Sequence, residues 1–155
     1  MNQEQVKLAE ALVDRKNHKT KLESLKQRLY RNVRVQDGEI PTEDPSALLE
    51  QLAREIEAFV SIVTAINLAN TRTRLPDGRT LTEALIRRDM LRYVHIVHTN
   101  MADKAMAPVD RYSRREIRMV PTVDVTTLRS QADEFAKTHR MLDLAIQAKN
   151  WEAVL

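Results

Sequence analysis

Two histidines are the first residues whose type and spacing could do chemistry. His95 and His98 stand three positions apart, so on a helix they share one side and could supply two ligands of a zinc or iron site. Such a site needs further ligands, and the sequence holds no cysteine and no Glu-x-x-His pair to supply them. We therefore expect two partly exposed, hydrogen-bonded histidines and no cofactor, with the metal site as the weaker alternative.

A hydrolytic triad is a second possible chemistry. His139 and Asp143 are four positions apart and could pair on a helix, which is half of a Ser-His-Asp arrangement. The nucleophile would be a serine on a sharp turn, but the sequence has no Gly-x-Ser-x-Gly motif, and Ser113 is the one loop serine near many basic groups. These patterns favour a protein that is not an enzyme.

Arginines in two segments between the predicted helices could bind anions. A guanidinium group binds phosphate or carboxylate through two hydrogen bonds, so each segment could hold an anion or a nucleic-acid backbone without reading its sequence. In a bundle the second segment faces the acidic connection at 37–44, so an ion-pair network within or between subunits is the favoured interpretation. The candidate residues are Arg72, Arg74 and Arg79 in the first segment and Arg111, Arg114, Arg115 and Arg118 in the second.

Asp89 is a carboxylate on an apolar stripe of a predicted helix. It follows Leu85 by four positions and precedes Ile96 by seven, so we expect it to be partly buried and paired. Arg88 and Arg92 are the local partners, and an arginine of another chain is the alternative. Such a pair more often fixes the register of packing than performs catalysis.

The elements that must position these residues are four long helices. The prolines and glycines all fall between segments free of helix breakers, at about 2–32, 46–70, 80–106 and 125–149. The 155 residues are 43% hydrophobic and 30% charged, which is enough for one core. We predict a single, mainly all-α domain over 1–155, an up-down-up-down bundle, with a coiled-coil hairpin of the first two helices as a variant.

Two short segments alternate between apolar and polar residues, which is typical of β-strands. They are 33–36 and 116–120, and Pro121 confines the second to an edge strand or a broken strand. In an up-down bundle the first and third connections lie at the same end. We therefore predict a short β-ribbon there, within one chain or across a dimer.

The segment 80–106 is apolar on two sides. One stripe contains Leu81, Leu85 and Ile96, and a second overlaps it. This width indicates contact with more than one neighbour. Because closed twofold assemblies are the commonest, a homodimer is the default expectation. The second stripe consists of Ile86, Met90, Tyr93, Val97 and Met101.

Charge is segregated along the first half of the chain. Residues 1–34 carry nine basic and four acidic groups, whereas residues 35–70 carry one basic and seven acidic groups. The opposite signs predict that the first two helices pair. The acidic neighbour would repel a phosphate backbone, so nucleic-acid binding through the basic first helix is possible but not favoured.

Membrane segments and export signals are not evident in the sequence. No stretch approaches the roughly 20 apolar residues of a membrane-spanning helix, and the first residues lack the apolar run of a secretory signal. The absence of cysteine fits a reducing compartment. We therefore expect a cytoplasmic protein without a membrane segment.

Several motifs spread along the chain are distinctive as a set. They are Asn70-Thr71-Arg72-Thr73, Asp77-Gly78-Arg79-Thr80-Leu81-Thr82-Glu83-Ala84-Leu85, Arg87-Arg88-Asp89, Asp110-Arg111-Tyr112-Ser113, Val123-Asp124-Val125 and Ile146-Gln147 followed by Asn150-Trp151. Together they resemble the septicolysin-like family of small bacterial proteins, over nearly the whole chain from Lys7 onward. The resemblance implies no catalytic residues, and the family label implies a cytolysin.

The sequence favours a non-enzymatic helical-bundle protein that acts by self-association or binding. Anion or sequence-independent nucleic-acid binding through the arginine-rich segments is the first alternative. A cytolysin is disfavoured, because a pore-former needs an export route and apolar surface that enters a bilayer, whereas the predicted helices have charged outer faces.

Overall fold

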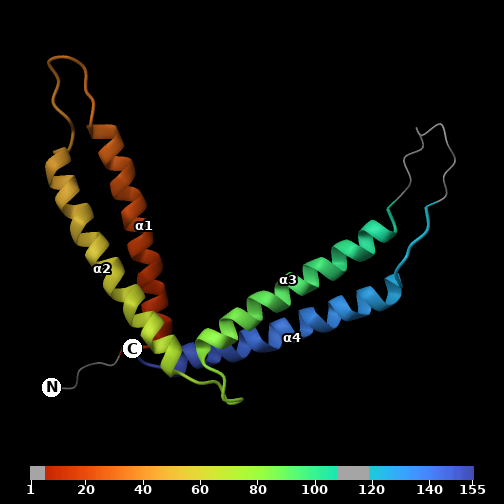
Figure 1. Cartoon of the computed structure of the whole chain (residues 1–155). Coiled ribbons are helices and arrows are strands. Elements are labelled where there is room, and N and C mark those ends of the chain that lie inside the picture. Colours follow the sequence, from red (N-terminus) through yellow and green to blue (C-terminus); the bar gives the residue numbers. More distant parts are fainter. Residues whose placement is uncertain (1–5, 108–118) are drawn as a thin grey trace, which may run out of the picture. The chain divides into compact units, whose positions relative to one another are not determined.

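Four long helices make up most of the structure, a computed structural model that describes residues 6–107 and 119–155 (Figure 1). The helices are α1 (Leu8–Asn32), α2 (Pro45–Arg72), α3 (Leu81–Ala105) and α4 (Val125–Glu152). The predicted all-α class with four long helices is confirmed. Over the described ranges, no helix is both long and apolar enough to cross a bilayer.

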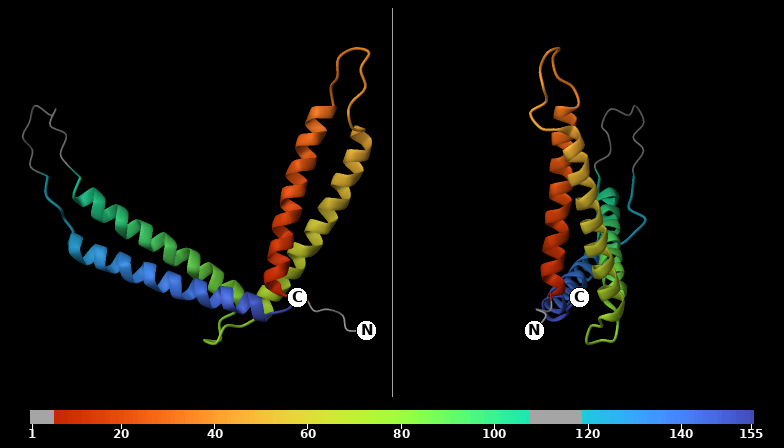
Figure 2. Two further views of the ribbon diagram at one scale, coloured as in Figure 1. Left: turned by 180° about the vertical axis from the view of Figure 1, so that it is seen from behind. Right: turned by 90° about the vertical axis from the view of Figure 1, so that its left-hand side faces the viewer.

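The chain divides into two compact units, each containing a helical hairpin. Unit 1 comprises Met1–Arg74 and Ala148–Leu155, and unit 2 comprises Leu75–Gln147. Unit 1 holds the α1/α2 hairpin and unit 2 the α3/α4 hairpin, and the helices of each hairpin run antiparallel and side by side (Figures 1 and 2). The organisation as a single domain stays a prediction.

Side chains at the breaks between segments explain where three helices begin. The Asp44 carboxylate accepts two backbone N–H groups of α2, at 3.0 and 3.4 Å, and Pro45 occupies the first position, where its missing N–H costs nothing. Thr80 and Glu83 form a reciprocal capping box at the start of α3. Asp124 caps α4, accepting a backbone N–H at 2.9 Å.

The first helix begins later than the expected position near residue 2. Val6 and Lys7, directly before Leu8, pair with the C-terminal segment within unit 1, and Lys7 is extended. Leu8 donates its N–H to the Ala153 carbonyl at 2.8 Å, and Lys7 and Val154 form an antiparallel β-bridge. The backbone groups that a longer helix would have used are thus satisfied by a distant part of the sequence.

The predicted β-ribbon is wrong over 33–36, where the structure has a loop. Gly38, with a φ of 84°, turns the chain directly after this segment. Both valines of the segment are exposed, at 67% and 41%, so the alternation has no buried face to pack against. Residues 119–120 are not in a strand either, and 116–118 lie outside the described residues.

The core of the first hairpin is a cluster of leucines between α1 and α2. Leu25 and Leu29 of α1 pack with Leu48 of α2, and Leu52 adds a partly buried side chain. The predicted pairing of the basic first helix with the acidic second helix is therefore confirmed. Apolar burial of this kind is the main stabilising term of such a hairpin.

The second hairpin buries small and branched side chains from both helices. His98 of α3 also contacts Phe135 of α4, with ring centroids 5.0 Å apart. The buried apolar residues are Leu81, Ala84, Leu91 and Ala102 of α3 and Leu128, Ala132, Leu142 and Ile146 of α4.

Candidate interaction surface

The inner face of α3 is the side that packs on α4. It contains Ala84 and Leu91, which are buried, and Arg88 and His95, which reach polar groups of α4. Arg88 donates to the Asp143 carboxylate at 3.2 Å, and His95 Nδ1 donates to a backbone carbonyl of α4 at 2.9 Å. These contacts fix which side of α3 the hairpin covers.

The opposite side of α3 carries an apolar stripe that the hairpin leaves exposed. We call it the α3 outer stripe, and its first four residues each come two positions after a residue of the inner face. Two positions are about 200° of an α-helix, so the two faces lie back to back. Ile86, Met90, Tyr93 and Met101 are 61%, 51%, 62% and 42% exposed, and Val97 is partly buried.

Opposite charges stand at the two ends of the α3 outer stripe. Glu83 lies three positions before its first residue and Lys104 three positions after its last, and both are exposed. Residues three apart share one side of a helix, so both charges belong to the outer side of α3. The apolar part between them is about 22 Å long at 1.5 Å per residue.

Asp89 lies on the flank of α3 and not in its core. Its side chain is 62% exposed and pairs with Arg88 at 3.0 Å, so the expected pairing is present and the expected burial is wrong. Arg88 is the more buried partner, at 25% exposed, because it faces α4 while Asp89 stands about 100° further round the helix. Ile96, on the same predicted stripe, is 45% exposed.

The two spaced histidines are held by backbone carbonyls. His98 Nδ1 donates to the carbonyl of Val94 at 2.9 Å, in addition to the contact of His95 with α4. Both rings are partly buried and hydrogen-bonded, as expected. Among the described residues, no three His, Cys, Asp or Glu side chains gather where they could hold a metal ion.

The arginines of the first predicted anion site are divided between the two units. Arg72 and Arg74 line an open pocket of about 440 Å³ in unit 1, together with Lys149. Arg72 also donates to the backbone carbonyl of Val154 at 3.2 Å. Arg79 lies in a turn of unit 2, where its hydrogen bond lowers the pKa of the neighbouring aspartate. The second set, Arg111, Arg114, Arg115 and Arg118, lies outside the described residues.

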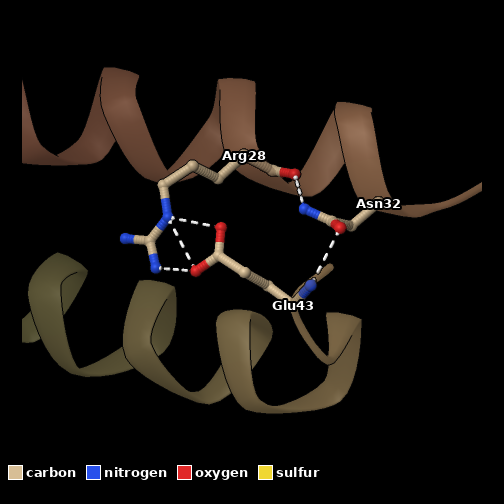
Figure 3. A network of polar contacts seen from close by, with 3 residues as sticks. All are labelled: Arg28, Asn32 and Glu43. Carbon is tan, nitrogen blue, oxygen red and sulfur yellow. Dashed lines mark hydrogen bonds and ion pairs between the residues drawn. The ribbon is translucent and has the colours of Figure 1, made fainter. Parts of the chain in front are cut away.

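The acidic loop between α1 and α2 is tied to α1 by a polar network (Figure 3). The Arg28 guanidinium binds the Glu43 carboxylate, with Nε to oxygen distances of 3.1 and 3.0 Å. Asn32, which is 8% exposed, accepts the Glu43 N–H at 3.0 Å and donates to the Arg28 carbonyl at 2.9 Å. The hydrogen bond from Arg28 lowers the pKa of Glu43 below its ordinary value. The acidic loop therefore pairs with a basic residue of α1, whereas the sequence predicted the second arginine-rich segment as its partner.

A second polar contact joins the middle of the first hairpin. His18 Nδ1 donates to the Glu55 carboxylate, and both side chains are largely buried, at 23% and 17% exposed. Glu55 also lines a shallow groove of about 310 Å³ with Lys21 and Arg54. The stretch without large apolar residues in the middle of the first helix was the only sequence signal for this contact.

Comparisons with known proteins identify relatives without an assigned function. A family model described as "Family of unknown function (DUF6847)" matches residues 15–155. A crystal structure of a functionally unknown conserved protein from Corynebacterium diphtheriae is similar at 36% identity and a TM-score of 0.89, covering 97% of this chain and 99% of that chain. No curated protein matches the sequence. The resemblance to the septicolysin-like family stays a prediction.

Proposed function

The chain belongs to the DUF6847 family of unknown function, and we propose that it acts by self-association or binding through the α3 outer stripe, without catalysis. A family of unknown function carries no activity to transfer. The proposal therefore depends on the surface of the molecule itself.

One observation carries the proposal: α3 is apolar on both sides, and its hairpin covers one of them. A surface helix of a globular protein normally has one apolar stripe and a polar opposite face. Here the opposite face presents Ile86, Met90 and Tyr93, each more than half exposed. Contiguous exposed apolar surface with charged residues at its rim is typical of a docking site for another protein.

The polar side chains that could have done chemistry have structural partners instead. His95 is bonded to a carbonyl of α4, and Asp143 accepts from Arg88. Asp143 is also the residue that could have paired with His139 in a triad. Side chains that hold two helices together in this way position the hairpin and, with it, the outer stripe.

The native mass, measured by light scattering at low and high salt, tests the proposal. We expect an oligomer at both salt concentrations, because apolar contacts are not screened by ions. Met90→Glu should raise the dissociation constant by about tenfold or more, since each buried apolar side chain contributes about 1.5–3 kcal/mol and every 1.4 kcal/mol is a factor of ten.

Met141→Glu is the matched control for this measurement. Met141 is 64% exposed on α4, so it receives the same substitution outside the α3 outer stripe. The control should leave the native mass unchanged. A wild-type protein that is monomeric at every concentration and binds no helical partner through α3 would contradict the proposal.

Anion binding is a second candidate, favoured by the pocket that Arg72 and Arg74 share with Lys149. Glu152 lines the same pocket and pairs with Lys149 at 3.1 Å, so the net positive charge that attracts a phosphate group comes from Arg72 and Arg74. Retention on immobilised DNA that weakens steeply with salt would support it, and Arg74→Ala should reduce that retention. Absence of retention at low salt would eliminate it.

A further inference from the structure

We infer that the partner of the α3 outer stripe is the same stripe of a second copy of the chain, packed antiparallel about a twofold axis beside Tyr93. This inference rests on the proposed function and adds the partner and its orientation. Of the helices that could dock on α3, the partner is α3 of a second copy.

Four of the five residues of the stripe lie symmetrically about one point of α3, and the fifth, Tyr93, lies next to that point. Ile86 and Met101 lie equally far from the midpoint between residues 93 and 94, and so do Met90 and Val97. About such an axis, Ile86 packs opposite Met101 of the second copy and Met90 opposite Val97. A twofold contact requires this self-complementarity, because each residue pair occurs twice.

The charges at the ends of the stripe select the antiparallel orientation. About the same midpoint, Glu83 stands opposite Lys104 of the second copy, and this pair also occurs twice. A parallel arrangement would instead place Glu83 beside Glu83 and Lys104 beside Lys104. Like charges across an interface are unfavourable, so charge complementarity suppresses that orientation.

The exposed apolar residues of α2 are a poorer surface for a second copy. Leu49, Ile56 and Val60 are about half exposed. Glu50 and Glu57 flank them on the exposed side of an acidic helix. Pairing α2 with itself would bring these carboxylates together, whereas α3 carries both signs of charge along its length.

Disulfide cross-linking tests the orientation, because the chain has no cysteine of its own. Tyr93→Cys places a thiol beside the twofold axis. Helix axes about 8–10 Å apart bring facing Cα atoms into the range of about 4.4–6.8 Å that a disulfide needs. We expect the Tyr93→Cys protein to oxidise rapidly to a covalent dimer.

Arg92→Cys is the matched control for the twofold position. Arg92 is an exposed neighbour on the same helix but points away from the stripe. Its oxidation should be at least about ten times slower, since the thiols must meet by collision between dimers. Circular dichroism of both variants verifies that α3 still forms.

A mixture of two variants distinguishes antiparallel from parallel packing. Ile86→Cys and Met101→Cys should each cross-link poorly alone and rapidly when the reduced proteins are mixed before oxidation. Rapid self-linking of Ile86→Cys would overturn the inference in favour of a parallel pair.

The native mass separates failure of this inference from failure of the proposed function. A wild-type dimer whose Tyr93→Cys variant oxidises no faster than Arg92→Cys would overturn the α3 pairing and leave self-association standing on another surface, such as α2. A wild-type monomer at all concentrations would overturn the inference together with self-association, and the proposed function as a whole would fall if that monomer also bound no helical partner through α3.

Discussion

The two hairpins leave apolar side chains exposed in different places. On α2, Leu49 and Ile56 each come one position after a residue that faces α1, which is about a quarter of a turn. On α3, the outer stripe comes two positions after the inner face, which is about half a turn. The exposed residues of α2 are therefore the edge of one broad apolar face, whereas those of α3 form a second face.

The hairpins also differ in where polar contacts hold them together. In unit 1, Arg28, Asn32 and Glu43 tie the loop to the end of α1, and His18 meets Glu55 further down the hairpin. In unit 2, Arg88 and His95 join the two helices along their length. Among the described residues, polar contacts thus hold the first hairpin at its closed end and in its middle, and the second hairpin along the face opposite its exposed stripe.

The largest effect should come from neighbouring leucines on α2. Leu48 is 1% exposed in the leucine cluster and Leu49 is 56% exposed. Leu48→Ala should lower the free energy of unfolding by about 2–5 kcal/mol, because it leaves a cavity between α1 and α2. Leu49→Ala should change it by less than about 0.5 kcal/mol.

Urea denaturation followed by circular dichroism measures both variants. Alanine favours helix at least as well as leucine, so helix propensity does not confound the pair. If both substitutions lowered the free energy of unfolding equally, Leu49 would belong to a covered face and not to an exposed edge. The contrast drawn between α2 and α3 would then be wrong.

A smaller effect is expected at the closed end of the first hairpin. Asn32→Ala removes the acceptor of the Glu43 N–H and the donor to the Arg28 carbonyl. Leaving such groups unpaired costs about 1–3 kcal/mol, so the free energy of unfolding should fall by that amount and the loop at 33–44 should be cleaved faster by protease.

Asn17→Ala is the control, since Asn17 is exposed on the same helix. It should change the free energy of unfolding by less than about 0.5 kcal/mol and leave the cleavage rate of the loop unchanged. Loop cleavage that is no faster in Asn32→Ala would show that the network does not stabilise the closed end.

The smallest effect is the pH dependence of the Arg28–Glu43 pair. The pKa of Glu43 is lowered from 4.5 by its hydrogen bond with Arg28. A carboxyl whose pKa is lowered by folding contributes stability above its ordinary pKa, and this contribution is lost as the pH falls through the lowered value. Glu43→Gln should therefore flatten the fall in stability below about pH 4.5, whereas Glu50→Gln should not.

Thermal unfolding at a series of acidic pH values compares the two variants with wild type. Glu50 is a suitable control because it forms an ion pair with Arg54 at 3.8 Å on the open surface of α2. An unchanged pH profile in Glu43→Gln would mean that the network of Figure 3 is not coupled to folding.

Much of the fold was predictable from local features. Prolines and glycines between the segments, and caps such as Asp44 and the Thr80–Glu83 box, act within a few residues of themselves. The predicted ribbon at 33–36 is wrong because alternation describes a strand that has a buried side, whereas residues 33–40 are exposed. The late start of α1 depends on residues 153–155, which no local pattern connects to it.

The sequence predicted which residues of the candidate surface share one side of α3, but not that this side is exposed. The spacing of Ile86, Met90 and Tyr93 determined that they share one side of a helix. Helical spacing does not determine burial. The sequence placed Asp89 on an apolar stripe, yet its side chain is exposed in the structure.

The sequence by itself determined four helices, their breaks and the outer apolar stripe of α3. These properties follow from backbone conformation and helical periodicity, which are local. The tertiary structure alone decided which side of α3 meets α4, that Arg88 reaches Asp143, and that Glu43 returns to Arg28. Such choices depend on contacts between residues far apart in the chain, where packing decides which face of each helix is covered.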